Sequence, residues 1–265
     1  CIDWDGDTLL PKPTWHYKDP RHGDKISLKE LLTTCYDLKT PKPDILDVLA
    51  KQASNMSDDM THMLEDAAAR QSYMEKRHVI DMLEDFGCWM EPPTLLKVLR
   101  QLAPRLYSIS SSPLENPKNV TLTVAVVEYE QLGKERIGVC STFLNNRVSK
   151  GSKVPVYIYG NPDFRLPEDH TTPIIMVGPG TGVAPFRSFL HHRLLSKQSM
   201  NKENNLLFFG SRRRDQDFLY GDEFEEMECD EKLTLITAFS RQQEHKVYVQ
   251  HRIEEHGESI WKALE

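Results

Sequence analysis

Residues 28–102 carry apolar side chains at helical spacing. Ser27-Leu28-Lys29-Glu30 is a capping-box pattern, and Leu28, Leu31, Leu32 and Cys35 follow on one helical face. Further apolar runs predict helices over 44–53, 57–73 and 75–86, the last one ended by Gly87, and a fifth helix from Pro92-Pro93 to Leu102. An all-helical block is therefore predicted, with methionines as core filler.

The pattern changes at Arg105 to short alternating runs that are typical of strands. We predict strands over 106–110, 120–129 and 154–159, a hairpin loop at 130–136 and a short helix at 141–148. Residues 1–27, rich in Pro, Asp, Lys and aromatic side chains, offer at most one more strand. Short antiparallel strands with turn signals predict a small β-barrel, which the helical block interrupts or precedes.

From Pro173 onward the pattern alternates between strand and helix. The predicted order is strand 174–177, helix 184–195, strand 206–209, helix 221–228, strand 233–239 and helix 248–256. This alternation predicts a doubly wound parallel sheet, which binds ligands at the carboxyl ends of its strands. The fold class is thus α/β plus all-β. An antiparallel barrel comes from 1–27 and 103–170, a helical insertion spans 28–102, and the parallel-sheet domain spans 171–265.

Composition narrows the class of protein. The chain has 265 residues, 39% of them hydrophobic, and a net charge of -7, so no basic surplus is present to bind nucleic acid. Its five cysteines form no C-x-x-C pair, which argues against a zinc or iron–sulfur site and favours reduced thiols in the cytoplasm. No signal peptide or apolar run of about 20 residues indicates export or a membrane span. Because Cys1 is not an initiator methionine, we expect the chain to begin inside a longer protein or to lack preceding residues.

A glycine-rich turn joins the first predicted strand of the parallel sheet to its helix. Gly178, Gly180 and Gly182 lie in the stretch PIIMVGPGTGVAPFRSFL. A strand, a tight glycine turn and a helix direct backbone N–H groups and a helix dipole at a phosphate. The spacing is neither G-x-G-x-x-G nor Walker A, so ATP hydrolysis is not indicated. Taken alone, the turn is equally compatible with a simple connection between strand and helix.

Two further stretches are suited to a phosphate-bearing ligand with a flat ring. Arg105-Leu106-Tyr107-Ser108 lies at the start of a predicted strand. In extended backbone Arg105 and Tyr107 point to one face, where a guanidinium can pair with phosphate and an aromatic ring can stack. Gly138-Val139-Cys140-Ser141-Thr142 leads into a helix with free N–H groups, with Ser141 or Thr142 expected as the cap. A surface ladder and an ordinary helix start are the alternatives.

The end of the third predicted strand of the sheet is basic. Ser240-Arg241 is followed by Lys246, Tyr248 and Gln250, and no acid stands at the strand end, where NAD-specific sites place one. A hydroxyl, a guanidinium and an ammonium can gather on a 2′-phosphate, so this end favours NADP(H). A solvated run of charges is the alternative.

Together these motifs resemble the FAD- and NADPH-binding half of the diflavin reductases. That family includes the sulfite reductase flavoprotein component, microsomal cytochrome reductases, methionine synthase reductase and the reductase part of nitric oxide synthase. The resemblance runs from about Lys25 to the end of the chain. It rests on the order of APRLYSISSSP, GVCSTFL, NPDFRLP, the glycine stretch, FFGSRRRDQDFLY and AFSRQQEHKVYVQ. It implies a ferredoxin-NADP reductase-like fold in which the helical block is the connecting domain.

The resemblance also implies roles for individual residues. Arg105 binds the FAD pyrophosphate, Tyr107 stacks on the flavin, and Ser108, the catalytic candidate, lies near the flavin N5 that receives hydride. The remaining FAD-binding residues are Thr123, Ala125, Tyr129, Gly138, Val139, Cys140 and Ser141. The NADPH-binding residues are Gly180, Thr181, Gly182, Arg212, Ser240, Arg241, Lys246, Tyr248 and Gln250. No metal site is implied.

The implied activity is electron transfer, in which NADPH reduces FAD and the electrons pass to FMN on a module outside this chain, then to a haem or metal partner protein. A sulfite reductase flavoprotein is favoured over a cytochrome reductase or a nitric oxide synthase-like reductase. The family's Cys–Asp pair and its terminal aromatic residue have no counterpart before Glu265, which leads us to expect either a fragment or a chain that lacks its flanking residues. A docking module that binds FAD without turnover and a flavin-free dehydrogenase remain alternatives.

Overall fold

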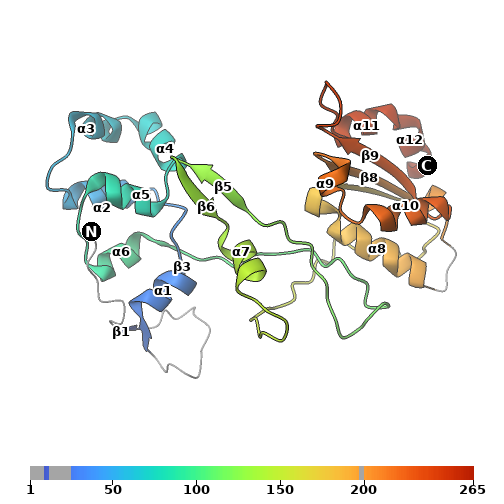
Figure 1. The fold of residues 1–265 in the computed structure, drawn as a ribbon, viewed down its shortest axis with the longest axis horizontal. Coiled ribbons are helices and arrows are strands. Elements are labelled where there is room, and N and C mark those ends of the chain that lie inside the picture. Colours follow the sequence, from blue (N-terminus) through green and yellow to red (C-terminus); the bar gives the residue numbers. More distant parts are fainter. Residues whose placement is uncertain (1–8, 12–24, 197–199) are drawn as a thin grey trace. The chain divides into compact units, whose positions relative to one another are not determined.

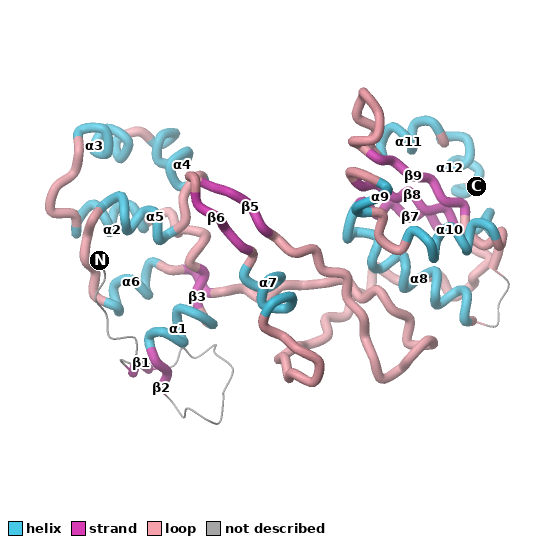
Figure 2. Tube along the Cα trace, in the orientation of Figure 1, coloured by secondary structure: helices cyan, strands magenta, loops and turns pink. Residues whose placement is uncertain are grey.

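The computed structural model describes residues 9–11, 25–196 and 200–265 (Figure 1). The chain forms two compact units. Unit 1 contains Cys1–Arg105 with Glu128–Ile137, and unit 2 contains Leu106–Val127 with Gly138–Glu265. Helices dominate unit 1, whereas unit 2 combines a parallel sheet, its helices and long irregular segments (Figure 2).

Unit 1 consists mainly of short helices. They are α1 (Leu28–Thr34), α2 (Ile45–Gln52), α3 (Asp58–Glu65), α4 (Ala67–Glu75), α5 (Val79–Phe86) and α6 (Pro92–Val98). As predicted, the Ser27 hydroxyl caps α1 by accepting the Glu30 N–H at 3.2 Å, and Gly87 ends α5 with a left-handed φ of +55°. The predicted helical block is therefore present.

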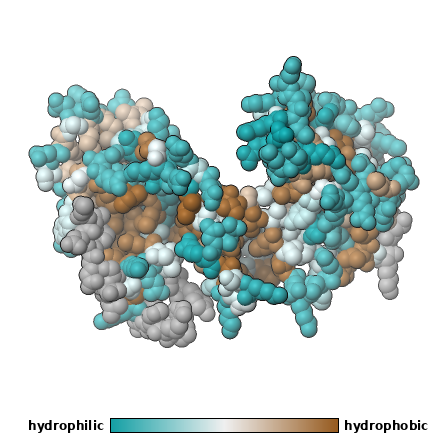
Figure 3. Space-filling model, viewed as in Figure 1, coloured by the Kyte–Doolittle hydropathy of each residue, from teal (hydrophilic) through white to brown (hydrophobic). Residues whose placement is uncertain are grey.

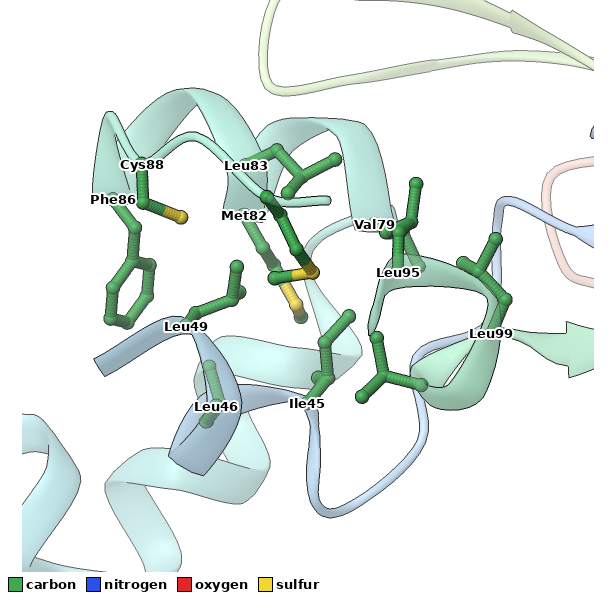
Figure 4. Packing of buried hydrophobic residues seen from close by; sticks show 12 residues of the cluster. Ile45, Leu46, Leu49, Val79, Met82, Leu83, Phe86, Cys88, Leu95 and Leu99 are labelled. Atoms are coloured by element: carbon green, nitrogen blue, oxygen red, sulfur yellow. The ribbon is translucent and has the colours of Figure 1, made fainter. Parts of the chain in front are cut away.

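The core of unit 1 joins α2, α5 and α6. Ile45, Leu46 and Leu49 from α2 meet Met82 from α5 and Leu95 from α6, and all five side chains are buried (Figure 4). Two buried thioethers, Met82 and Met90, belong to this apolar packing, as expected for methionines that fill a core.

Four details of unit 1 differ from the sequence prediction. The helix predicted over 57–73 is broken at Asp66, because the Asp66 carboxylate accepts the N–H groups of Ala68 and Ala69 at 2.7 and 2.9 Å and so begins a new helix. The helix predicted from Glu75 begins at Val79 instead. The block also contains a short antiparallel pair, β3 (Tyr36–Asp37) with β4 (Arg100–Gln101). A second pair, β1 (Leu9–Pro11) with β2 (Lys25–Ser27), lies within the first 27 residues, where at most one strand was predicted.

A β-hairpin completes unit 1. Strands β5 (Glu128–Gln131) and β6 (Lys134–Ile137) pair around Leu132 and Gly133, whose φ values of 55° and 67° are both left-handed. Two such residues form the turn that matches the twist of a two-residue hairpin. The predicted loop at 130–136 is therefore mostly strand.

The sheet of unit 2 is parallel and has the order β7 (Ile174–Pro179), β8 (Asn205–Ser211), β9 (Thr234–Phe239). The register pairs Ile174 with Asn205 and Leu206 with Thr234. The helices that follow the strands are α8 (Ala184–Leu195), α9 (Arg214–Asp217), α10 (Gly221–Cys229), α11 (Val249–Glu255) and α12 (Gly257–Leu264), with 3₁₀ turns η1 (Gly180–Val183) and η2 (Lys202–Asn204).

Helices cover both faces of this sheet. Leu207 and Phe209 of β8 pack with residues of α8 and α10, such as Leu190 and Phe224, in one core. Leu206 and Phe208 point the other way and pack near α11 and α12 in a second core. Figure 1 shows α8 and α10 on one side of the strands and α11 and α12 on the other. The doubly wound prediction is confirmed for this domain.

Residues 106–170 contain less regular structure than predicted. Ile109 and Leu122 form an isolated antiparallel bridge, and α7 (Val139–Asn146) begins two residues earlier than expected. The predicted strand at 154–159 is not formed, and Val156 and Ile158 are 81% and 78% exposed. The β-barrel itself stays a prediction.

Candidate functional site

The carboxyl ends of the three parallel strands form one edge in unit 2. Beyond β8 and β9 the backbones stay paired, since Ser240 N–H donates to Ser211 O at 3.0 Å and Arg241 N–H donates to Arg212 O at 2.9 Å. Three of the residues predicted to bind NADPH, Arg212, Ser240 and Arg241, are therefore neighbours. This edge is where sheets of this kind bind nucleotides.

The glycine turn lies at the end of β7. Gly180 has a φ of +55° and begins the 3₁₀ turn η1, which leads directly into α8. A Cβ on Gly180 would meet no atom of the described residues within 4 Å, so glycine is required there by backbone conformation and the turn borders open space. Among the residues that the structure describes, no side chain caps η1 or α8, so N–H groups of Thr181 and its neighbours remain for a ligand. This geometry fits a pyrophosphate.

The cations at this edge differ in how strongly they are paired. Arg212 is exposed, and its Nε lies 3.4 Å from Asp217 Oδ2. Arg241 and Lys246 are exposed and form no ion pair within the described residues; their loop stands out as a hydrophilic projection at the top of Figure 3. Burial opposes ionisation of Asp217, but N–H donors from Arg213 and Arg212 outweigh it and lower its pKa. Within the described part of the chain, no carboxylate pairs with Arg241 or Lys246, so both can meet an anion.

Other polar groups at this edge also fit a ligand. The Ser211 hydroxyl is buried without a hydrogen-bond partner of normal geometry among the described residues, although it contributes to lowering the Asp217 pKa. Tyr248 is 40% exposed, with its ring 5.8 Å from that of His251, and Gln250 is exposed on α11. Gly210 lets α11 approach β8, since a Cβ there would lie 2.7 Å from Val249 Cγ1.

The segment with Tyr107 and Ser108 also belongs to unit 2. Tyr107 is partly buried and Ser108 is exposed. Two residues later, Ser110 N–H donates to Thr121 O at 2.9 Å, and Thr121 N–H donates to Ser111 Oγ at 3.0 Å. These bonds place the segment beside residues 121–125, which include the predicted FAD-binding residues Thr123 and Ala125.

Two helices hold these paired segments, which the sequence did not predict. From α8, Arg187 Nη1 donates to Ser110 O and Ser188 Oγ donates to Ser111 O, both at 2.8 Å. Tyr220, which precedes α10, shares a hydrogen bond of 2.6 Å between its hydroxyl and Thr123 Oγ1. Ala125 is exposed. A polar side chain such as Arg187 beside the apolar face of a predicted helix is the only sequence signal for these contacts.

The start of α7 contradicts the predicted N-cap at Ser141 or Thr142, and it is compatible with the predicted phosphate site. Neither Ser141 nor Thr142 caps the helix; the N-cap is Gly138, without a side-chain hydrogen bond. Instead Ser141 Oγ accepts the Val127 N–H at 3.1 Å, and Thr142 Oγ1 donates to Gly138 O at 2.7 Å. The helix begins earlier than predicted, at Val139, so both hydroxyls belong to residues inside it and cannot act as its N-cap. N–H groups of Val139 and Cys140 are consequently left for a phosphate.

Two predicted FAD-binding residues lie in unit 1. Arg105 is exposed and donates from Nη1 to Ala103 O at 3.1 Å. The Tyr129 hydroxyl lies 3.0 Å from His78 Nε2, and Lys39 Nζ lies 4.8 Å from the centre of the Tyr129 ring. The structure therefore brings Tyr129 together with side chains of the helical block that were not predicted as site residues.

Other features of the described chain are not tied to this chemistry. Unit 1 has a hollow of about 440 Å³, whose lining includes none of the predicted site residues: Tyr36, Lys42, Leu96, Leu99, Arg100 and Gln101. In the described ranges, His, Cys, Asp and Glu form no group of three suited to a metal ion. Among the helices of those ranges, none combines the length and apolar character needed to cross a membrane.

Two family models match this chain. The model described as "FAD binding domain" matches residues 7–143, more than half of the 265 residues, and that described as "Oxidoreductase NAD-binding domain" matches residues 176–264. The chain belongs to the FAD-binding domain family. The second match contains the glycine turn and the strand ends described above, and the first contains Tyr107 and the start of α7. The resemblance to the FAD- and NADPH-binding half of the diflavin reductases is confirmed.

Curated relatives match nearly all of the chain. "NADPH oxidoreductase A" of Dictyostelium discoideum is 42% identical over an alignment of 258 residues, which covers 94% of this chain and 40% of the relative. The "Sulfite reductase [NADPH] flavoprotein alpha-component" of Vibrio cholerae is 41% identical over 244 residues (92% and 39%), and that of Bacillus subtilis is 39% identical over 265 residues (97% and 43%). The chain spans about two fifths of the length of these relatives.

Proposed function

We propose that this chain is the FAD- and NADPH-binding part of an electron-transfer flavoprotein. The observation that carries this proposal is that matches to an FAD-binding and an NAD-binding domain share one chain. The edge of the second holds the glycine turn and cations that form no ion pair among the described residues. NADPH reduces FAD, and the electrons pass to FMN on another module and then to a haem or metal protein. A sulfite reductase flavoprotein is the specific form supported by the names of the relatives. Its proposed location is the cytoplasm, in line with cysteines that form no C-x-x-C pair.

The residue assignments belong to this proposal. FAD is bound by Arg105, Tyr107, Ser108, Thr123, Ala125, Tyr129 and the Gly138–Ser141 start of α7. NADPH is bound by Gly180, Thr181, Gly182, Arg212, Ser240, Arg241, Lys246, Tyr248 and Gln250. We also propose a barrel from 1–27 and 103–170, a connecting domain over 28–102 and an NADPH-binding domain over 171–265. FAD, when bound, supplies the ability to accept a hydride and release single electrons, while the protein's residues position the two rings.

A flavin titration tests the core of the proposal. The purified 265-residue chain is titrated with FAD, and the visible absorbance of the flavin is followed together with NADPH-driven reduction of ferricyanide. We expect saturable FAD binding and turnover. FAD binding without turnover would support a docking module instead, and turnover without flavin a simple dehydrogenase.

Cofactor choice tests the assignment of the basic edge. Replacing Ser240 and Arg241 with apolar residues should weaken NADPH binding far more than NADH binding, because a charge-assisted contact to the 2′-phosphate contributes about 1.5–3 kcal/mol. Lys202→Ala is the control, since Lys202 precedes the amino end of β8 and pairs with Glu231 at 2.8 Å. Equal losses for both nucleotides would refute the 2′-phosphate assignment.

A further inference from the structure

Helix α8 contacts both parts of the proposed cofactor site. It begins at Ala184, directly after the glycine turn, and one turn later Arg187 and Ser188 donate to the carbonyls of Ser110 and Ser111. Four residues of α-helix rise about 6 Å, so a short rigid element joins the two segments. We propose that Arg187 is a positioning residue that fixes the segment carrying Tyr107 and Ser108 relative to the glycine turn. The inference rests on the proposed function of these two segments.

The guanidinium of Arg187 is held on several sides. Its Nε and Nη2 donate to Glu223 Oε2 at 3.1 and 2.9 Å, and its Cζ lies 4.6 Å from the centre of the Tyr220 ring. The remaining nitrogen, Nη1, donates to Ser110 O. The Arg187 side chain is only 14% exposed. The carboxylate and the ring fix the plane of the Arg187 guanidinium. Its remaining N–H donor therefore points at the backbone of residues 106–112.

Glu223 is itself held in place. Its second oxygen, Oε1, lies 2.6 Å from His191 Nε2, and His191 Nδ1 lies 3.5 Å from Glu115 Oε2. Burial favours the neutral carboxyl group, yet hydrogen bonds from His191 and Arg187 outweigh it, and the pKa of Glu223 is lowered. Glu223 therefore stays ionised at neutral pH and keeps Arg187 oriented.

Additional contacts hold the same paired segments. The Tyr220 hydroxyl reaches Thr123 on the second segment, and Ser112 Oγ lies 3.1 Å from His192 Nδ1 on α8. Ser110 and Ser112 are fully buried. The bonds end on backbone carbonyls and hydroxyls of the segment and not on apolar side chains, so they fix its position more than they add to a core.

Unit 1 contains a matched arrangement. Arg77 Nε donates to Asp85 Oδ2 at 2.7 Å, its Cζ lies 3.9 Å from the centre of the Tyr73 ring, and the Tyr73 hydroxyl donates to Asp85. This is the same combination of guanidinium, carboxylate and tyrosine, but the Arg77 side chain donates to no backbone carbonyl among the described residues. Arg77→Ala is therefore the control. It removes the same kind of guanidinium, carboxylate and tyrosine contacts but leaves the donor to the segment 106–112 in place.

The first test uses the 265-residue chain without added FAD. Hydrogen exchange followed by mass spectrometry reports the protection of the Ser110 and Thr121 amides, which donate within the paired segments. Arg187→Ala should raise exchange there about tenfold or more while β7–β9 stay protected, because a fixed donor to the segment is lost. Arg77→Ala should leave these amides unchanged, and Arg187→Lys should give an intermediate result.

The second test uses the FAD-loaded chain. Arg187→Ala should lower kcat for NADPH-driven ferricyanide reduction by about 10–100-fold, with KM for NADPH changed less than about threefold, because misplacement costs rate more than nucleotide affinity. Added guanidinium ion should restore part of kcat in Arg187→Ala and none in the control. If Arg187→Ala does not fold, Ser188→Ala and Tyr220→Phe are read in the same two assays, each with a smaller shift of the same kind.

The outcomes separate the two proposals. Unchanged exchange at Ser110 and Thr121 in Arg187→Ala, or an equal rise in Arg77→Ala, would overturn the positioning role even if the chain turns over NADPH. A wild-type chain that binds no FAD and oxidises no NADPH would defeat the proposed function, while the exchange measurement would still decide whether Arg187 positions the segment.

Discussion

Each unit of this protein uses a carboxylate to hold a non-helical segment against helices, and the two carboxylates differ in how deeply they are buried. In unit 1, Asp81 is 3% exposed and accepts hydrogen bonds from His78 N at 2.9 Å, Lys134 Nζ at 3.0 Å and Arg136 Nη2 at 2.5 Å. In unit 2, Glu223 is 27% exposed and pairs with Arg187 and His191. The first cluster joins hairpin strand β6 to α5, and the second joins the segment 106–112 to α8 and α10.

The difference in burial separates two uses of the same chemistry. Asp81 also begins α5, through the N–H of His78, so its charge is bound into the helical fold itself. Glu223 lies nearer the surface and orients Arg187, whose last donor reaches a backbone carbonyl. We therefore expect the buried carboxylate of Asp81 to contribute mainly to the stability of the fold. The more exposed carboxylate of Glu223 should contribute mainly to the position of the segment 106–112.

The largest expected effect breaks the unit 1 cluster. Asp81→Ala leaves the charges of Arg136 and Lys134 without their buried partner, so we expect the free energy of unfolding to fall by about 3–5 kcal/mol. Urea denaturation followed by circular dichroism measures it. Glu84→Ala is the control, because Glu84 pairs with Lys134 while 58% exposed, and should cost less than about 1 kcal/mol. Similar losses for both variants would contradict the importance of depth.

A smaller loss is expected at the unit 2 cluster. Glu223→Ala removes a charged acceptor from Arg187 and His191, and water can partly replace it, so the free energy of unfolding should fall by about 1.5–3 kcal/mol. Glu223→Gln keeps one acceptor and should lose less. Denaturant unfolding at neutral pH checks both variants, and a loss as large as that of Asp81→Ala would erase the proposed difference.

Lowering the pH tests the contribution of the Glu223 carboxylate to stability. Because the folded-state pKa of Glu223 lies below its ordinary value of 4.5, its contribution to stability is complete above about pH 4.5 and is lost as the pH falls through the folded pKa. The stability difference between wild type and Glu223→Gln should therefore shrink below that pH. Urea midpoints measured from pH 7 to pH 3 follow it; a difference that stays constant would show that Glu223 ionisation does not stabilise the fold.

The smallest effects concern two tyrosine hydroxyls, one in each unit. Tyr129 shares a hydrogen bond with His78, and Tyr220 shares one with Thr123. Tyr129→Phe and Tyr220→Phe should each cost about 0.5–1.5 kcal/mol of unfolding free energy. Combining Tyr220→Phe with Thr123→Val in a double-mutant cycle isolates the second bond, and strictly additive losses would show that the pair does not interact.

Sequence patterns predicted most elements, because each rests on local rules. Ser27 and Gly87 delimit helices through hydrogen bonding and a left-handed φ, and both are readable from residue type. The alternation of strand and helix patterns after Pro173 is also a local signal, and it predicted the parallel sheet. Asp66 was missed because its capping role competes with an apolar period that runs straight through it.

Sequence patterns did not predict the polar contacts between residues far apart in the chain. Arg187 meets Glu223 36 positions later, and Thr123 meets Tyr220 97 positions later, and no periodicity encodes such pairs. The Ser141 hydroxyl was predicted as a cap but bonds the Val127 N–H, which only the folded chain brings near. Val154–Tyr159 has the composition of a strand, yet a strand needs a partner that composition does not supply.

The strand order β7-β8-β9 has a consequence for how the chain folds. Spatial neighbours in the sheet are also successive strands, and their first paired residues lie 31 positions apart from Ile174 to Asn205 and 28 apart from Leu206 to Thr234. Each pairing closes a loop of similar, moderate length, and loop-closure entropy grows only slowly with length. During synthesis on the ribosome the sheet can therefore be extended one strand at a time, in the order in which the strands emerge.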